Sequence, residues 1–453
     1  MFIEKLIIKG FKCFKNKTEI KIDSFNGIIG NNGSGKTSIL EALSRMFGTD
    51  YKYRKINSND FFLELGESLE KKSKRELSIE VKIGFYNEDV DISECFNQMT
   101  VDSIGGKPYC RIKLEAIWEK TSNPDGDIEE KMYWINSSDE EVKDSNKIPL
   151  SMSDRSKIKV YYIPATRNPQ KQMQHTSGTL VYQFLKNINW SENTLENFEK
   201  TNEILSKIIQ EERGFVTLNN KLSSSWSKLF NEKIYKNISI NTTSNDFNSH
   251  LSKIEARFSP NPGEAVETEE KLSDGMKSLF YFSLITSMFE LEEMLRNSQE
   301  DSGFSVDLKL MPSLTIFAIE EPENHLSPHY FGKVMKNFRE ITKNKRSQVI
   351  VTSHSPSIIK RINPEEIRYV LQDKDRISSV KEIELPADKS DAYKFVKEAI
   401  KAYPELYFSR LVILGEGDSE EVVIPKIAEA YGIELDSDFV SIVPLGGRYV
   451  NHF

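Results

Sequence analysis

The sequence has few cysteines and no long apolar run. Its 453 residues include three cysteines, Cys13, Cys95 and Cys110, without a CxxC pair, so we expect reduced thiols and neither a disulfide framework nor a zinc site. The longest apolar runs fall far short of the roughly 18 to 20 residues that a membrane helix needs. Residues 1–6 alternate like a strand and lack the apolar core of a signal peptide. We therefore predict a cytoplasmic protein without a membrane partner.

The sequence also lacks an excess of positive charge. Its 61 Lys and Arg residues against 69 Asp and Glu residues give a formal net charge of −8. A general attraction to nucleic acid is not expected, so any DNA contact would come from a local basic patch. The length predicts two or three domains, and a hydrophobic content of 38% argues against wholesale disorder.

Strand-like runs dominate both ends of a predicted α/β domain. They occur in residues 2–30 and then at residues 77–85, 110–118 and 158–163, and residues 121–130 are expected to form a polar loop. Strand-like and helix-like runs alternate again from residue 314 to residue 370. A polar link around residues 373–391 then leads into a predicted helix. This helix is expected over residues 392–403, and a buried apolar strand is expected over residues 411–414.

The middle of the chain has a different texture. Residues 176–262 are rich in Asn, Ser, Lys and Glu and show helical spacing of apolar residues. We interpret them as a helical insertion that interrupts the α/β domain and could serve dimerisation; a surface elaboration without an interface is the alternative. The predicted parts are therefore residues 1–175, 176–262, 263–385 and 386–453.

A phosphate-binding loop is the clearest motif. Residues 30–37, Gly-Asn-Asn-Gly-Ser-Gly-Lys-Thr, match the P-loop pattern GxxxxGK[ST] between a strand-like and a helix-like run. Backbone N–H groups and the helix N-terminus can bind phosphates there. Lys36 is predicted to bridge the β- and γ-phosphates of ATP, and Thr37 to bind Mg²⁺. The predicted nucleotide-binding residues of this loop are Asn31, Asn32, Gly33, Ser34, Gly35, Lys36, Thr37 and Ser38.

Two later apolar runs also end in polar groups. Residues 314–319 run into Glu320 and Glu321, an arrangement that fits a metal-holding acid followed by a general base. Residues 349–352 lead to His354. A histidine at the C-terminal end of a strand, in the sheet that carries the P-loop, is placed to contact a phosphate.

These motifs resemble the ABC and SMC-type ATPases. Residues 272–277, Leu-Ser-Asp-Gly-Met-Lys, look like the LSGGQ signature loop of that family, with Ser273 and Gly275 kept. The resemblance implies that Glu320 is the Walker B acid, Glu321 the catalytic glutamate and His354 the switch histidine. Glu320 stands where the family usually has Asp, and we expect ATP binding to survive that change.

The resemblance has a consequence for assembly. In this family the signature loop completes the ATP site of the opposite subunit, so Ser273 would contact a nucleotide that is held by a partner's Lys36. A working site then implies a homodimer or a higher homo-oligomer. No glutamine is assigned to the Q-loop of the family.

The last part of the chain resembles the first acidic motif of Toprim domains. An apolar run leads into Gly415-Glu416-Gly417, where the glycines leave room for a metal ion beside the carboxylate. Residues 161–167, 402–410 and 446–447 further resemble the OLD family of ATPase–Toprim nucleases, which includes the nuclease subunit of the Gabija anti-phage system. The resemblance implies DNA cleavage regulated by ATP, with Glu416 as catalytic acid and metal ligand and Glu420 as a second ligand.

Two functions of different classes follow from these motifs. In the Toprim domains of that family a DxD-type acidic pair follows on the next strands, and none is assigned to it before Phe453. We therefore expect the ATP-hydrolysing regulatory module of an OLD-type endonuclease whose nuclease domain is incomplete in this chain. The alternative is an SMC-like ATPase sensor or scaffold that never cuts and works with a separate effector, such as a helicase-like or other defence partner. A transporter ATPase fits less well, because residues 321–328 read as an OLD/SMC-like segment. The predicted fold is α/β: an ABC/SMC-type P-loop ATPase with a helical insertion, followed by the first part of a Toprim domain.

Overall fold

A computed structural model of the chain divides into two compact units, one of residues 1–167 with 309–453 and the other of residues 168–308. Arg167, residues 446–449 and the side chain of Cys95, all named above, lie outside the described residues. The structure describes residues 1–86, 94–101, 107–123, 126–165, 185–229, 246–251, 254, 257–258, 267–268, 271–297, 303–304, 311–383, 385, 393, 397 and 401–444. Within this described part, no helix is long and apolar enough to cross a membrane.

A six-stranded sheet carries the P-loop. Its strands lie in the order β14-β13-β3-β12-β11-β8, and all neighbours are parallel except β14, which is antiparallel to β13. The residues of β3, β11 and β12 are all buried, which confirms the buried strands predicted from their apolar runs. The bounds are β3 (Phe25–Ile29), β8 (Ile158–Ile163), β11 (Leu314–Glu320), β12 (Ser347–Ser353), β13 (Ile367–Gln372) and β14 (Ser378–Glu382).

The position of β14 corrects one prediction. Residues 373–391 were expected to form a polar link, but residues 378–382 of that segment form a strand with β13. Three of the five residues of β14 are exposed. An edge strand that faces solvent has no apolar run to reveal it.

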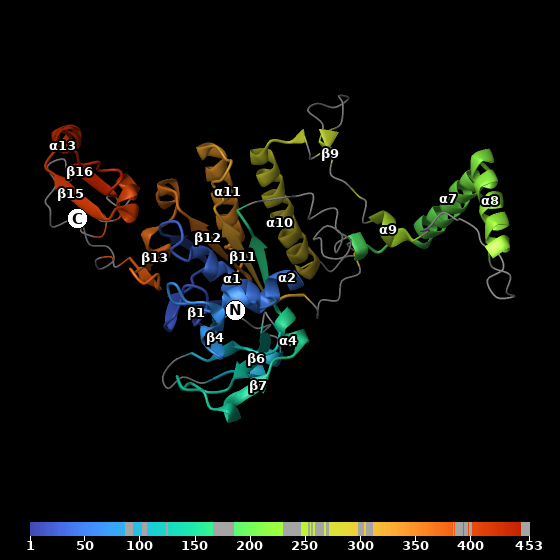
Figure 1. The fold of residues 1–453 in the computed structure, drawn as a ribbon, viewed down its shortest axis with the longest axis horizontal. Helices are drawn as coiled ribbons and strands as arrows, with labels where there is room; N and C mark the ends of the chain where they lie inside the picture. Colours follow the sequence, from blue (N-terminus) through green and yellow to red (C-terminus); the bar gives the residue numbers. More distant parts are fainter. Residues whose placement is uncertain are drawn as a thin grey trace. The chain divides into compact units, whose positions relative to one another are not determined.

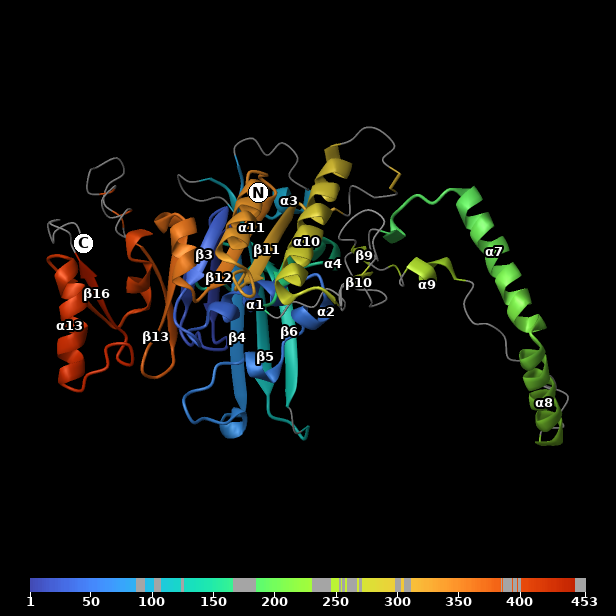
Figure 2. The ribbon, with the colours of Figure 1, turned by 90° about the horizontal axis from the view of Figure 1, so that it is seen from above.

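A second, antiparallel sheet lies in the order β2-β1-β4-β5-β6-β7. Figure 2 shows β4, β5 and β6 side by side, in agreement with their pairing along the whole length of β6. The predicted loop over residues 121–130 was partly wrong, because β6 begins at Asp127. Most side chains of β6 are not buried, so the strand reads as polar. The bounds are β1 (Phe2–Lys9), β2 (Thr18–Lys21), β4 (Lys74–Gly84), β5 (Tyr109–Glu119), β6 (Asp127–Ile135) and β7 (Lys147–Pro149).

Helix α1 (Lys36–Phe47) and helix α11 (Pro328–Ile341) cover opposite faces of the parallel sheet. Ile316 of β11 belongs to the core cluster that joins α1 with the antiparallel sheet. The ring of Phe317, the next residue, instead lies 6.4 Å from that of Phe338 on α11. This alternation follows from the pleat of the strand, and the layers are visible in Figure 1. The shorter helices of this unit are α2 (Tyr51–Arg54), α3 (Glu94–Gln98) and α4 (Met152–Ser156).

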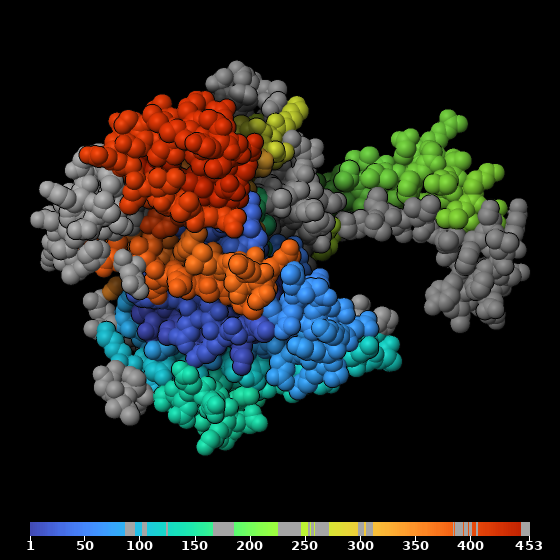
Figure 3. Space-filling view, turned by 60° about the vertical axis from the view of Figure 1, so that its left-hand side comes forward, coloured from blue at the N-terminus to red at the C-terminus, as the bar shows by residue number. Residues whose placement is uncertain are grey.

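The C-terminal segment, red in Figure 3, adds a small parallel sheet. In it β15 (Leu411–Gly415) pairs with β16 (Val440–Pro444), and α13 (Asp418–Ala430) connects the two strands. The strand at 411–414 is confirmed, but its predicted burial is wrong, since Leu411 is 56% exposed. Within the described residues β15 has one neighbouring strand. Of the predicted helix over residues 392–403, residues 393, 397, 401, 402 and 403 are described; the first four are helical and Tyr403 is not.

The second unit is largely helical in its described part. Helices α7 (Glu192–Glu211) and α8 (Arg213–Leu229) follow one another, and α7 confirms the helical spacing read from the sequence. The extent of the helical insertion, residues 176–262, stays a prediction. The remaining elements are α9 (Phe247–Leu251), β9 (Arg257–Phe258), β10 (Glu267–Thr268) and the long α10 (Asp274–Asn297).

Candidate functional site

The predicted phosphate-binding loop connects β3 to α1 in the structure. Gly30 and Gly35 have φ angles of +154° and +105°, in the region where side chains are strained. A Cβ on Gly30 would meet the Val370 carbonyl oxygen, and one on Gly35 would meet the Cys13 sulfur, both closer than 3.0 Å. These two positions therefore require glycine, both for their φ angles and because neighbouring atoms leave no room for a Cβ.

Lys36 is folded back across this loop. Its side chain is buried, with the residue only 6% exposed, and Nζ donates hydrogen bonds to the carbonyl oxygens of Gly30 at 2.8 Å and Asn31 at 2.9 Å. Burial lowers the pKa of Lys36, and the charges of Glu321 and Glu323 offset part of that effect. The ammonium is thus held at the loop by groups that an anionic ligand can replace.

The other predicted residues of the loop differ in exposure. Asn31, Asn32, Gly33 and Thr37 are exposed, whereas Ser38 is buried. Ser34 is also buried, and within the described residues its Oγ has no hydrogen-bond partner. The exposed atoms are those available to a ligand that enters from solvent.

Glu320 is the last residue of β11, and its side chain contacts the segment that follows β8. It is 7% exposed, and its Oε2 accepts a hydrogen bond from the Ala165 backbone N–H at 3.1 Å. Burial raises the pKa of Tyr162, and the nearby charge of Glu320 raises it further. The predicted Walker B acid is therefore engaged with the segment that follows β8.

Glu321 and His354 meet where β11 and β12 end. Glu321 Oε1 lies 2.9 Å from His354 Nδ1, and its Oε2 accepts a hydrogen bond from Asn324 Nδ2 at 2.8 Å. Burial acts to raise the pKa of Glu321, but the bonds from Asn324 and His354 and the charge of Lys36 outweigh it, so the pKa is lowered. Glu321 also has a φ of +40°, a strained value of the kind that clusters at functional sites.

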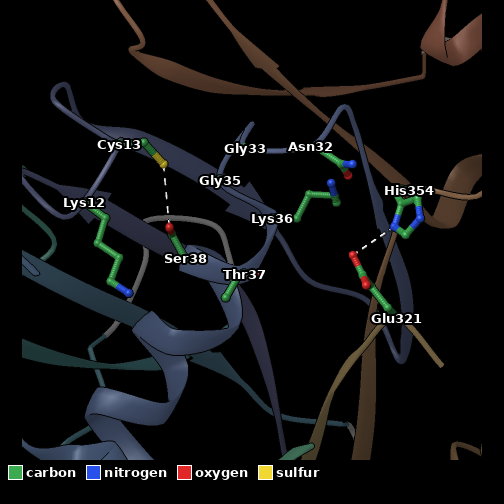
Figure 4. A pocket seen from close by; sticks show the side chains of 10 residues that line it. All are labelled: Lys12, Cys13, Asn32, Gly33, Gly35, Lys36, Thr37, Ser38, Glu321 and His354. Atoms are coloured by element: carbon green, nitrogen blue, oxygen red, sulfur yellow. Dashed lines mark hydrogen bonds and ion pairs between the residues drawn. The ribbon is translucent and has the colours of Figure 1, made fainter. Parts of the chain in front are cut away.

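These groups surround one cavity of about 480 Å³. Figure 4 shows Lys36, Asn32, Glu321 and His354 on one side of it, with Cys13 and Ser38 on the other. The structure thus brings together Lys36, Glu321 and His354, which are far apart in the sequence. The full lining is Lys12, Cys13, Asn32, Gly33, Gly35, Lys36, Thr37, Ser38, Glu321 and His354.

The cavity fits a metal ion that arrives with a ligand. Thr37 lines it, whereas Glu320 does not. Among the described residues no group of three or more His, Cys, Asp or Glu side chains could hold a metal ion. Mg²⁺ is commonly held by one or two protein groups together with substrate phosphates, so the Thr37 hydroxyl beside a bound triphosphate is a suitable donor set.

The predicted signature residues belong to the other compact unit. Ser273 precedes α10, and its Oγ accepts a hydrogen bond from the Met276 backbone N–H at 3.4 Å. Ser273 is exposed and Gly275 is partly buried. The hydroxyl is therefore accessible at the first turn of a helix, where anions are favoured.

The predicted Toprim residues lie at the start of α13. Glu416 is in the turn between β15 and α13, and Glu420 is in the first turn of α13. Glu416 is exposed, whereas Glu420 is partly buried. The Glu420 Oε2 accepts hydrogen bonds from the Gly417 backbone N–H and the Ser419 hydroxyl, each at 3.0 Å. The backbone hydrogen bond from Gly417 lowers the pKa of Glu420. Glu420 thus caps α13, while Glu416 is open to solvent.

Several residues at the cavity were not predicted from the sequence. Lys12 and Cys13 enter it from the loop after β1, and Asn324 supports Glu321. Glu323, also in the turn after β11, accepts a hydrogen bond from Ser353. The acidic character of that turn was a signal for Glu323, whereas no local pattern distinguishes Cys13.

Two family profiles match the chain. One, described as an AAA ATPase domain, matches residues 1–359. The other, described as the Toprim domain of overcoming lysogenization defect protein-like proteins, matches residues 407–453. Domains of these two kinds use a nucleotide and a divalent metal ion.

Curated relatives resemble almost the whole chain. "Endonuclease GajA" of Bacillus cereus (strain HuB5-5) is 24% identical over an alignment that covers 99% of this chain and 71% of that protein. "OLD nuclease" of Thermus scotoductus is 20% identical, with 98% of this chain and 77% of that protein covered. Both therefore share the order of the two matched domains.

The solved structures that the chain matches include SMC head domains. The SMC head domain with an extended coiled coil from Pyrococcus furiosus is 17% identical, with a TM-score of 0.42 over 89% of this chain and 99% of that one. The SMC head domain from Thermotoga maritima is 16% identical, with a TM-score of 0.37 over 85% of this chain and 100% of that one.

Proposed function

Because the chain belongs to the AAA ATPase domain family, we propose that it binds and hydrolyses ATP with Mg²⁺ to regulate a DNA-cleaving Toprim domain. The match to an OLD-like Toprim domain over residues 407–453 supports the second half of this proposal. So do the printed names of the two relatives, an endonuclease and a nuclease. An anti-phage role is part of the proposal, by analogy with those relatives.

One observation supports the ATPase half most directly. Lys36, Glu321 and His354 come from the starts or ends of three different elements and line the same cavity. A cation for phosphates, a carboxylate and an imidazole at one cavity are the groups that phosphoryl transfer to water requires.

The proposed chemistry assigns each of these groups a task. The Lys36 ammonium leaves the carbonyl oxygens of Gly30 and Asn31 and binds the β- and γ-phosphates. Water attacks the γ-phosphorus while the bond to the bridging oxygen of ADP breaks, and Glu321 accepts the proton of that water. The lowered pKa of Glu321 keeps it in the basic form near neutral pH. His354 holds the carboxylate and lies beside the transferred phosphate.

When bound, Mg²⁺ would neutralise part of the charge of the phosphates. In the proposal the Thr37 hydroxyl binds it directly. Glu320, which is longer than the usual Asp, contacts its water shell after a change of side-chain direction away from Ala165.

We further propose that ATP is bound between two copies of the chain. Ser273, exposed at the start of α10, would contact the nucleotide of the partner copy, together with Gly275. Helix α7 offers a contact surface, because Ile204, Leu205 and Ile208 are 52–61% exposed and share one side of the helix. Apolar side chains in such a row favour a helical partner.

At the C-terminal segment, Glu416 is proposed as catalytic acid and metal ligand of DNA cleavage. Its exposure beside Gly415 and Gly417 leaves space for a phosphate. Glu420 is the proposed second ligand, through the oxygen that does not cap α13. DNA is the proposed substrate by analogy with the matched nucleases.

Three variants test the ATPase proposal. Lys36→Ala should abolish binding of a fluorescent ATP analogue, whereas Lys343→Ala, which removes an exposed lysine paired with Glu340, should leave it unchanged. Glu321→Gln should bind ATP while hydrolysis falls by about 100-fold or more, the contribution of a general base. Normal binding by Lys36→Ala would contradict the central proposal, and normal hydrolysis by Glu321→Gln would identify another base.

A plasmid-nicking assay with a divalent metal tests the nuclease half. Nicking that disappears in Glu416→Ala supports the Toprim assignment, and nicking that persists contradicts it. We expect little nicking from this chain alone, because its Toprim domain is partial. Intact ATP hydrolysis without nicking therefore fits both the incomplete nuclease and the alternative of a separate effector.

A further inference from the structure

Two consecutive residues at the end of β12 are hydrogen-bonded to two glutamates of the turn after β11. His354 Nδ1 lies 2.9 Å from Glu321 Oε1, and the Ser353 hydroxyl donates a hydrogen bond to Glu323 Oε1. Ser353 is completely buried. The strand end that presents His354 is therefore attached to this turn at two points.

The Ser353 hydroxyl also fixes the backbone on the far side of His354. Its Oγ accepts a hydrogen bond from the Ser355 backbone N–H at 3.0 Å. Because Ser353 and Ser355 flank His354, the hydroxyl that Glu323 binds determines where the His354 backbone lies. The contacts thus form a continuous path from Glu323 through Ser353 and His354 to Glu321.

Packing alone does not explain why a glutamate occupies position 323. Its Oε2 is buried and has no hydrogen-bond partner among the described residues. Burial raises the pKa of Glu323, and the hydrogen bond from Ser353 counters only part of that effect. A carboxylate in such a place costs free energy that an apolar side chain of similar size would not. The charge of Lys36 interacts with Glu323 as well as with Glu321, so the group lies within electrostatic reach of the cavity.

We propose that Glu323 is a positioning residue, which holds His354 against Glu321 through the hydroxyl of Ser353 and thereby sets the rate of hydrolysis. This inference rests on the proposed ATPase function. Glu323 does not line the cavity, so it acts on the step that uses Glu321 and leaves nucleotide affinity to the P-loop. A misplacement of a reacting group by about 1 Å can cost about 100-fold in rate.

The test compares Glu323→Ala, Glu323→Gln and Ser353→Ala by steady-state kinetics. Glu323→Ala and Ser353→Ala should each lower kcat by about tenfold or more, with KM and the Kd for ATP within twofold of wild type. Glu323→Gln keeps an acceptor oxygen for Ser353 and should recover most of the lost kcat. The double variant Glu323→Ala/Ser353→Ala should be no slower than the slower single variant, because both act through one path.

The outcomes separate this inference from the ATPase proposal. A wild-type kcat in Glu323→Ala, a change confined to KM, or fully additive losses in the double variant would overturn the positioning role. If Glu323→Ala does not fold, as thermal unfolding would reveal, Ser353→Ala and Glu323→Gln still carry the comparison. Wild-type protein without ATPase activity, or Glu321→Gln with a normal rate, would instead overturn the proposed function and this inference with it.

Discussion

The sulfur of Cys13 occupies the space that a Cβ on Gly35 would need, at a separation below 3.0 Å. The same cysteine accepts a hydrogen bond at its carbonyl oxygen from the Ser378 backbone N–H at 2.9 Å. The Ser378 hydroxyl in turn donates to the Ser34 carbonyl oxygen at 2.6 Å. The loop after β1 and the edge strand β14 therefore contact each other and the P-loop.

Gly35→Ala should weaken nucleotide binding by about tenfold or more, because a Cβ at a φ of +105° is strained and also collides with the sulfur. Titration with a fluorescent ATP analogue measures the effect. Gly33→Ala is the matched control, since its φ is +78° but no atom lies within 4 Å of its Cβ, so a smaller loss is expected. Gly35→Ala/Cys13→Ala should regain part of the affinity. Equal losses in both single variants would show that the sulfur is irrelevant.

A mixing experiment tests the composite ATP site. Lys36→Ala and Ser273→Arg should each be inactive alone, since each damages both sites of a symmetric dimer. After mixing, a heterodimer has one site with both native residues, so ATPase activity should return to on the order of a quarter of the wild-type rate. No recovery, with subunit exchange verified by a tag, would mean that Ser273 does not serve a partner's nucleotide.

If the exposed apolar side chains of α7 form a contact between two copies of the chain, charged substitutions there should weaken oligomerisation. Ile204→Asp/Ile208→Asp should shift the protein towards monomer in light scattering, because two charges enter a proposed apolar contact. Thermal stability of the monomer should hardly change, since both side chains are exposed. Ile427→Asp on α13, which is exposed to a similar extent, is the control and should keep the oligomeric state. An unchanged mass for the α7 variant would exclude this contact.

Glu67 should contribute to the free energy of unfolding in a way that depends on pH. The hydrogen bond from Arg75, at 3.2 Å, together with that from the Glu64 backbone N–H, lowers the pKa of Glu67 to about 2. A carboxylate with a depressed pKa stabilises the fold fully above about pH 4.5 and loses that effect as the pH falls towards 2. The difference in urea midpoint between wild type and Glu67→Gln should therefore stay constant from about pH 7 to 5 and shrink below about 4.5. A difference independent of pH would contradict the assignment.

The strands that the sequence predicts well are those buried on both faces. β11 and β12 contain apolar runs at residues 316–319 and 349–351, and burial of both strands on both faces accounts for these runs. β6 and β14 were missed because most of their side chains face outward and their pairing depends on the backbone of a neighbour. The apolar run of β15 predicted a strand correctly but not its exposure, since burial depends on what packs against it.

The candidate site shows the same limit. Lys36, Glu321 and His354 were found because each follows or precedes a recognisable element. Cys13 and the Glu323–Ser353 contact depend on distances between segments far apart in the chain, for which a single sequence holds no local signal. The direction of Glu320 towards Ala165 is likewise a property of tertiary packing.

The sheet order has a consequence for protein synthesis. β3, which leads into the P-loop, lies between β12 and β13, and neither strand exists until the ribosome has translated residues 347–372. During most of elongation the nascent chain therefore presents β3 as an apolar segment with two unpaired edges. Chaperone dependence during translation, and aggregation when elongation stalls before residue 347, are the expected cost of that topology.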